Sequence, residues 1–183
     1  MKKIIEEAAG FVKELFDKEL DSRYRFHSLD HVLETVEAAG EIARHSGLDE
    51  TQREILLIAA WFHDAGYVEQ YDGHEEKSAE IAAKFVEARQ YPAERIKDVE
   101  RLIMATKMGH EPADLPEEII KDADMIHLGK KSSFKKGEML RRELDELRDH
   151  RYSDTEWLEL EEKFYDNARF HTQYARKEYG ERL

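Results

Sequence analysis

The sequence contains no cysteine and only three prolines among its 183 residues. Without cysteine there are no disulfides, no thiolate nucleophiles and no cysteine-based zinc sites, so any metal must be held by His, Asp or Glu. Such nitrogen and oxygen ligands suit manganese, iron, cobalt, nickel, magnesium or zinc. The scarcity of proline leaves long stretches free for helices, and no strand-like alternation of apolar and polar residues persists. We therefore predict an all-α fold.

Long apolar runs and an excess of positive charge are also missing. No run approaches the roughly 20 residues of a membrane span, and the first segment, MKKIIEEAAGFVKELF, carries acids where a signal peptide needs an apolar stretch. We expect a cytoplasmic protein that does not cross a membrane. The 29 basic residues are outnumbered by 42 acidic ones, giving a formal net charge of -13. This charge argues against general nucleic-acid binding, because most of the surface would repel the phosphate backbone.

The length fits a single domain that buries roughly 70% of the surface its unfolded chain would expose. No internal repeat, low-complexity tract or linker interrupts the sequence. We therefore predict one helical domain over residues 1–183, whose oligomeric state the sequence leaves open.

The stretch around which the rest is organised is Ile55–Tyr67, ILLIAAWFHDAGY. Its unbroken apolar run predicts a helix that is buried on nearly all sides, with Gly66 as its C-terminal stop. His63 and Asp64 then emerge from the core. An ionised Asp at such a place is costly unless it is paired, hydrogen-bonded or bound to a metal, and His is a natural co-ligand. Taken alone, the pair would more simply form a hydrogen bond that caps a helix, so the case for a metal rests on the other helices.

Apolar residues recur at helical spacing around 4–20, 29–43, 74–85, 92–106, 116–128 and 140–147. A capping-box sequence, Ser153–Glu156, starts a last helix that we expect to reach Tyr179. In the second of these helices, His31 flanks the apolar face and points sideways into the interior. In the segment 116–128, the acids Asp122 and Asp124 flank the apolar face on opposite sides. Periodicity cannot choose between them as the metal ligand.

Three sets of potential ligands therefore lean inward from three helices: His31, the pair His63 and Asp64, and either Asp122 or Asp124. Helix bundles build metal sites from facing helices in this way. Two imidazoles and two carboxylates leave open positions on an octahedral ion, which is what a catalytic metal needs.

With these residues, the sequence resembles the HD-domain superfamily of metal-dependent phosphohydrolases, whose pattern is a His, then His-Asp, then a distant Asp. FHSLDHVLETV resembles the first-His helix and AAWFHDAGY the HD helix, while IIKDADMIHLG resembles the terminal Ala-Asp motif. The intervening GHEEKSAEIA and LIMATKMGHEP resemble the family's middle segments. The resemblance implies an HD-type helical bundle with a core at about 24–129, a helical extension at 130–183, and a metal held by His31, His63, Asp64 and Asp124. It thus favours Asp124 over Asp122.

The resemblance also implies hydrolysis of a small phosphate ester or phosphoanhydride, a nucleotide among the candidates, by water that the metal activates. Within that mechanism His27 or Glu75 would move protons, and Lys107, with Thr106 or His110, would hold phosphate oxygens. We expect one metal ion, with a second as an option.

The second ion would use His74 and His110, which fall where two-metal members carry additional ligands. This keeps open a second function, that of a di-iron oxygenase of the same superfamily. The segment Met108–His110 departs from the two-metal pattern, in which a second His adjoins the first. A third alternative is a non-catalytic helical module in which the metal only stabilises the fold or binds a ligand.

Overall fold

The computed structural model describes residues 2–148 and 150–182, and among these residues it contains helices and no β-strand. The elements, in chain order, are α1 (Lys2–Glu19), α2 (Leu29–Ser46), α3 (Glu50–Phe62), η1 (Ala65–Val68), α4 (His74–Glu87), α5 (Ala93–Ala105), α6 (Leu115–Asp124), η2 (Met125–Gly129), α7 (Ser133–Leu147), α8 (Asp154–Asn167), α9 (Gln173–Tyr179) and η3 (Gly180–Arg182), where η marks a short 3-10 helix. The all-α prediction is confirmed.

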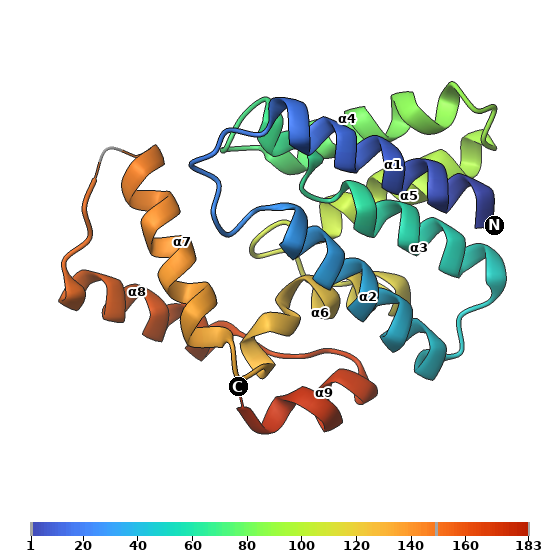
Figure 1. The fold of residues 1–183 in the computed structure, drawn as a ribbon. Coiled ribbons are helices and arrows are strands. Elements are labelled where there is room, and N and C mark those ends of the chain that lie inside the picture. The colour runs from blue at the N-terminus through green and yellow to red at the C-terminus, as the bar shows by residue number, and fades with distance from the viewer. Residues whose placement is uncertain (1, 149, 183) are drawn as a thin grey trace.

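Helix α3 lies at the centre of the bundle and packs against α1, α2, α4, α5 and α6 (Figure 1). It starts with a capping box, in which the Asp49 side chain accepts the N–H of Gln52 and the Gln52 side chain accepts the N–H of Asp49. Its apolar run is buried along almost its whole length. Each fully buried large side chain, such as Ile58 or Phe62, stabilises the fold by roughly 1.5–3 kcal/mol.

The central helix ends earlier than we predicted, and Gly66 has a different role from the expected stop. Helix α3 ends at Phe62, and the chain passes through His63 and Asp64 into η1. A Cβ atom on Gly66 would lie 2.0 Å from the carbonyl oxygen of His74 and 2.8 Å from the backbone nitrogen of Ser78. Glycine is therefore required because the start of α4 approaches the junction closely. The Gly66 N–H also donates to the Ser78 hydroxyl at 2.8 Å, which fixes α4 in place.

Helices α2 and α6 flank α3 and pack against each other. Helix α2 follows Ser28 and ends at Ser46, and its C-cap residue Gly47 has a φ of 76°, the left-handed conformation that favours glycine. Helix α6 is capped by Asp114, whose side chain accepts the N–H of Glu117 at 3.0 Å. The helix that we predicted to reach Leu128 ends at Asp124 and continues only as the 3-10 helix η2.

The C-terminal extension consists of α7, α8 and α9, with α7 and α8 together on one side of the bundle (Figure 1). The prediction of one helix from Ser153 to Tyr179 is wrong. Its start is confirmed, since Ser153 and Glu156 form the capping box, but α8 ends at Asn167 and Ala168 is extended. The reason is a tertiary contact: the buried carboxylate of Asp122 accepts the backbone N–H groups of His171 and Thr172, which are then unavailable to a continuous helix.

Within residues 2–148 and 150–182, no helix combines the length and the apolar character that crossing a membrane requires.

Candidate metal centre

The HD pair occupies the junction between α3 and η1, deep in the structure. His63 is the C-cap residue of α3 and is fully buried, and Asp64 is only 3% exposed. Because α3 is enclosed by five other helices, the chain that leaves its C-terminal end is still inside the bundle. The sequence therefore places an imidazole and a carboxylate where water cannot solvate them.

Side chains from α2 and α6 meet this pair. Nε2 of His31 lies 3.4 Å from Nε2 of His63 and 2.9 Å from Oδ1 of Asp124. The same Asp124 oxygen is 3.5 Å from Nε2 of His63. His31, His63 and Asp124 each offer one ligand atom, all within 4.8 Å of one another, as a metal site needs. We call these three residues the metal cluster.

Asp64 stands at the edge of this cluster. It is not among the three residues whose ligand atoms fall within 4.8 Å of one another. Its Oδ2, however, is 3.3 Å from Nε2 of His63 and 3.5 Å from Nε2 of His31, and both distances are shorter than 4.8 Å. We therefore keep Asp64 as a fourth candidate ligand, because its oxygen faces both imidazole nitrogens.

The atoms around the cluster fit a cation. Asp64 Oδ2 is buried and has no hydrogen-bond partner among the described residues, a costly arrangement for a carboxylate oxygen. The Nδ1–H of His63 donates to the carbonyl oxygen of Ala60 at 2.8 Å, which leaves the Nε2 lone pair directed at the cluster. Imidazole nitrogens and carboxylate oxygens converging on one point are the donor set of a divalent transition-metal ion or Mg²⁺.

The electrostatics point the same way. Burial opposes ionisation of His63, but Asp64 and Asp124 outweigh it and raise its pKa well above the ordinary value. Burial likewise works against ionised Asp124, yet His31 and His63 lower the pKa of Asp124 well below its usual range. The carboxylates therefore stay charged and demand a positive partner, which is either an imidazolium proton or a metal ion.

The two acids that periodicity left equivalent have separate partners. Asp124 faces His31 and His63, whereas Asp122 faces the C-terminal segment. Asp122 is 1% exposed, so it is a buried carboxylate and not a surface acid. Its Oδ1 accepts the N–H of His171 at 2.7 Å, and its Oδ2 accepts both the N–H and the hydroxyl of Thr172.

His74 and Glu75 form the start of α4, and His74 lies beside Asp64. Nε2 of His74 is 3.6 Å from Oδ1 of Asp64, and Nδ1 of His74 is 3.5 Å from Oε2 of Glu75. The His74 ring stacks on Tyr67 with centroids 3.8 Å apart. The structure thus brings His74 next to Asp64, whereas Glu75 contacts the other nitrogen of the His74 ring.

The side chains predicted to contact phosphate have partners outside the metal cluster; they are His110, Lys107 and Thr106. Nε2 of His110 is 2.9 Å from Oε2 of Glu117 on α6, and the Thr106 hydroxyl donates to the carbonyl oxygen of Ile103 at 2.7 Å. The Lys107 ammonium group pairs with Glu76. A second ion held by His74 and His110 stays a prediction, and the contact of His110 with Glu117 lends it no support.

Three residues near the metal cluster were not identified from the sequence, namely Lys121, His127 and Glu143. Lys121 donates to the carbonyl oxygens of Ala105 and Lys107, and burial lowers its pKa while Asp124 partly offsets that effect. His127 contacts the carbonyl oxygen of Asp124, and burial together with His31 lowers its pKa to about 4. The third is Glu143.

Glu143 on α7 is fully buried and meets His27. Its position three residues after Leu140 and four before Leu147 places it on the apolar stripe of that helix, which was the available sign of burial. Burial opposes the charged form of His27, but Glu143, Asp64 and Asp124 raise its pKa above the ordinary value.

Separate helices of an all-α bundle thus bring two imidazoles and a carboxylate to one buried point, an arrangement that could form a metal site of the kind helix bundles build. The family model of the HD domain matches residues 28–129, and the chain belongs to this family. That match contains all four candidate ligands and ends at Gly129, before α7.

The fold is also similar to that of a solved structure. The crystal structure of a predicted HD superfamily hydrolase from an uncultured Thermotogales bacterium matches with a TM-score of 0.63 and 22% sequence identity. The match covers 97% of this chain and 83% of that chain, so it includes the C-terminal extension. No curated protein matches the chain.

Proposed function

We propose that this protein is a metal-dependent hydrolase that acts on a small phosphate ester or phosphoanhydride, with nucleotides among its candidate substrates. The observation that carries the proposal is Asp64 Oδ2, a buried carboxylate oxygen without a hydrogen-bond partner among the described residues, aimed at the nitrogens of His31 and His63. Membership of the HD family supports the reaction class.

In this proposal His31, His63, Asp64 and Asp124 hold the ion. A divalent ion in that place supplies Lewis acidity, since it lowers the pKa of a water molecule and withdraws charge from a phosphoryl oxygen. The donor set of nitrogen and oxygen suits manganese, iron, cobalt, nickel, zinc or magnesium. Two imidazoles and two carboxylates would leave positions open on an octahedral ion for substrate and water.

The side chains next to the cluster handle protons. Hydrolysis forms a bond from the water oxygen to phosphorus, breaks the bond from phosphorus to the leaving oxygen, and gives that oxygen a proton. We assign donation of this proton to His27, whose ring lies beside that of His31, and removal of the water proton to Glu75, which contacts His74 at the start of α4. Proton exchange with solvent then restores both side chains. Lys107, Thr106 and His110 stay predicted phosphate contacts, and we propose Lys121 as a further one because its ammonium group feels the charge of Asp124.

The test combines elemental analysis with a substrate panel. Protein purified without added metal is analysed for bound ions and then assayed on phosphorylated metabolites with manganese, cobalt, nickel, magnesium, zinc or reduced iron. We expect about one ion per chain and phosphate release that Asp64→Asn abolishes. Absence of turnover with every metal would remove the basis of the proposal. Two irons per chain together with oxygen uptake would instead support the oxygenase alternative.

A further inference from the structure

A carboxylate from outside the family-matched region reaches the residues next to the metal cluster. Glu143 of α7 is 0% exposed, and its Oε2 accepts the backbone N–H groups of Phe26 at 2.8 Å and His27 at 3.1 Å. Its Oε1 contacts Nδ1 of the His27 ring. A buried carboxylate is costly unless donors surround it, and all three donors here belong to one short segment, residues 26–27.

The His27 ring lies between this carboxylate and the metal cluster. Its centroid is 6.1 Å from that of His31, 6.3 Å from that of His74 and 4.3 Å from that of Tyr67. Because a carboxylate accepts hydrogen bonds, the contact with Glu143 keeps a proton on Nδ1. Nε2 is then the only ring nitrogen that can exchange a proton with a substrate.

We propose that Glu143 is a positioning residue for the reaction: it holds the proton on Nδ1 of His27 and so directs Nε2 to the leaving oxygen. This inference rests on the proposed hydrolase function. Glu143 lies on α7, beyond the end of the family match at Gly129. The inference therefore assigns the C-terminal extension a role in the reaction.

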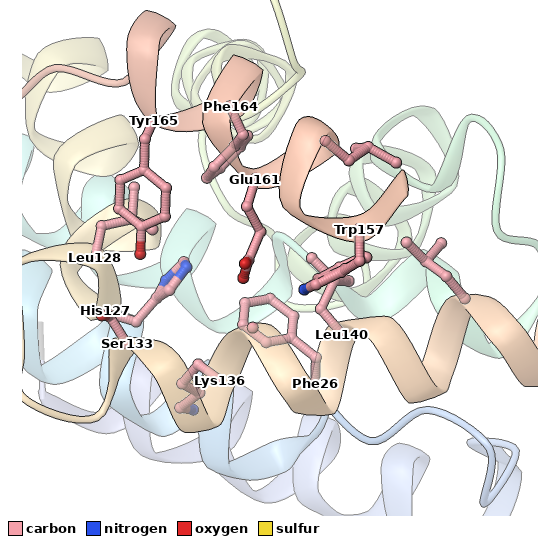
Figure 2. Close-up of a pocket in the computed structure, with 13 residues that line it drawn as sticks. Phe26, His127, Leu128, Ser133, Lys136, Leu140, Trp157, Glu161, Phe164 and Tyr165 are labelled. Atoms are coloured by element: carbon pink, nitrogen blue, oxygen red, sulfur yellow. The ribbon is translucent and has the colours of Figure 1, made fainter. Parts of the chain in front are cut away.

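The opposite side of α7 faces α8. Phe26 and Leu140 line a cavity of about 80 Å³ between α7 and α8, together with Trp157 and Phe164 of α8 (Figure 2). Helix α8 therefore covers the apolar side of α7, while Glu143 reaches from α7 to the backbone before α2. Near the end of α7, Glu146 pairs with Arg25 at 2.8 Å, but this ion pair is largely exposed.

The test compares Glu143→Gln with the matched control Glu146→Gln. In Glu143→Gln the amide oxygen can still accept the two backbone N–H groups, which turns the amide nitrogen toward Nδ1. That arrangement favours a proton on Nε2 alone, and the proton of a neutral imidazole is a much weaker acid. We expect kcat to fall roughly 10–100-fold, the range for loss of a partner that orients a catalytic side chain, with KM and bound metal nearly unchanged. Glu146→Gln removes only the exposed pair and should act like the unmodified protein.

A double-mutant cycle separates positioning from simple destabilisation. If Glu143 acts through His27, then His27→Gln combined with Glu143→Gln should be no slower than His27→Gln alone. Losses that multiply in the double variant, or a folded Glu143→Gln protein with unchanged kcat, would overturn the proposal. Thermal unfolding of each variant shows whether it is folded.

A measurement on the unmodified protein needs neither turnover nor a stable variant. The ¹⁵N resonances of the His27 ring, assigned by their loss in His27→Gln, report which nitrogen carries the proton. We expect a protonated Nδ1 in the metal-free protein. A bare Nδ1 at neutral pH would refute the positioning role whatever the activity. If Nδ1 is protonated but no phosphorylated substrate is hydrolysed with any metal, the proposed function fails and the hydrogen bond stands.

Discussion

Oδ2 of Asp122 accepts two hydrogen bonds from Thr172, one from the backbone N–H at 2.8 Å and one from the hydroxyl at 2.7 Å. Two residues further along the same helix, Asp124 faces His31 and His63. Helix α6 thus carries one carboxylate that anchors the C-terminal segment and one that faces the metal cluster.

This division predicts opposite results for two alanine variants. Asp124→Ala should lose bound metal and turnover. Asp122→Ala should keep the metal but destabilise the protein by about 1–3 kcal/mol, because buried N–H groups lose their acceptor. Metal content, rate and thermal unfolding decide the matter. Thr172→Ser, which keeps the hydroxyl, is the control and should remain close to the unmodified protein. Metal loss confined to Asp122→Ala would transfer the ligand role to that residue.

Asp64→Asn tests the unpartnered carboxylate oxygen. The amide keeps the shape of the side chain but removes the charge and one oxygen from the site. We expect metal affinity to fall by more than the roughly 10–100-fold that the loss of an outer partner costs. Titrating metal into the metal-free variant in a calorimeter measures the affinity. Affinity equal to that of the unmodified protein would exclude Asp64 as a ligand.

Metal removal should lower the stability of the whole fold. An ion that binds the native state alone stabilises it by about 2.7 kcal/mol at a free concentration 100 times Kd. Treatment with a chelator should therefore lower Tm, and adding the metal back should restore it in proportion to the logarithm of its concentration. The double variant His31→Ala with Asp124→Ala should show no such dependence. If the Tm of the unmodified protein does not change with metal concentration, a metal site at the centre of the bundle is contradicted.

Gly66→Ala should be strongly destabilising, in contrast to the exposed helical Gly10. The added methyl group at position 66 would lie 2.0 Å from a backbone oxygen, and α4 would have to move. At Gly10 a Cβ meets nothing within 4 Å, so Gly10→Ala should stabilise α1 by about 0.5–1 kcal/mol. Chemical denaturation of both variants measures the two effects. If both substitutions change the free energy of unfolding by similar small amounts, α4 can move away from position 66 without loss of stability.

The helices and the convergence of His31, His63 and Asp124 were predictable because they depend on local periodicity and on short motifs. Asp124 was separated from Asp122 only by the resemblance to a family, since both flank the same apolar face. Asp64 was expected at a junction where a buried helix ends in polar residues, but the lack of a hydrogen-bond partner for its Oδ2 is known only from the structure.

What could not be predicted depends on contacts between distant parts of the chain. The break between α8 and α9 has no glycine or proline to mark it, and it follows from Asp122 binding the backbone of His171 and Thr172. Glu143 reaches the backbone of Phe26 across 117 positions, a pairing that no local pattern encodes. Local spacing also could not reveal that the polar atoms of Thr106 and His110 contact Ile103 and Glu117.

The close approach at Gly66 limits which sequences can form this metal centre. The distance from position 66 to the start of α4 is set by backbone atoms, which no change of rotamer can move aside. Chains that keep the same junction should therefore carry glycine at this position across wide evolutionary distances, even where the residues around it have diverged. Gly10 has no such restriction and should vary freely. The record of natural substitutions at these two glycines would thus separate a requirement of the metal centre from a residue retained by chance.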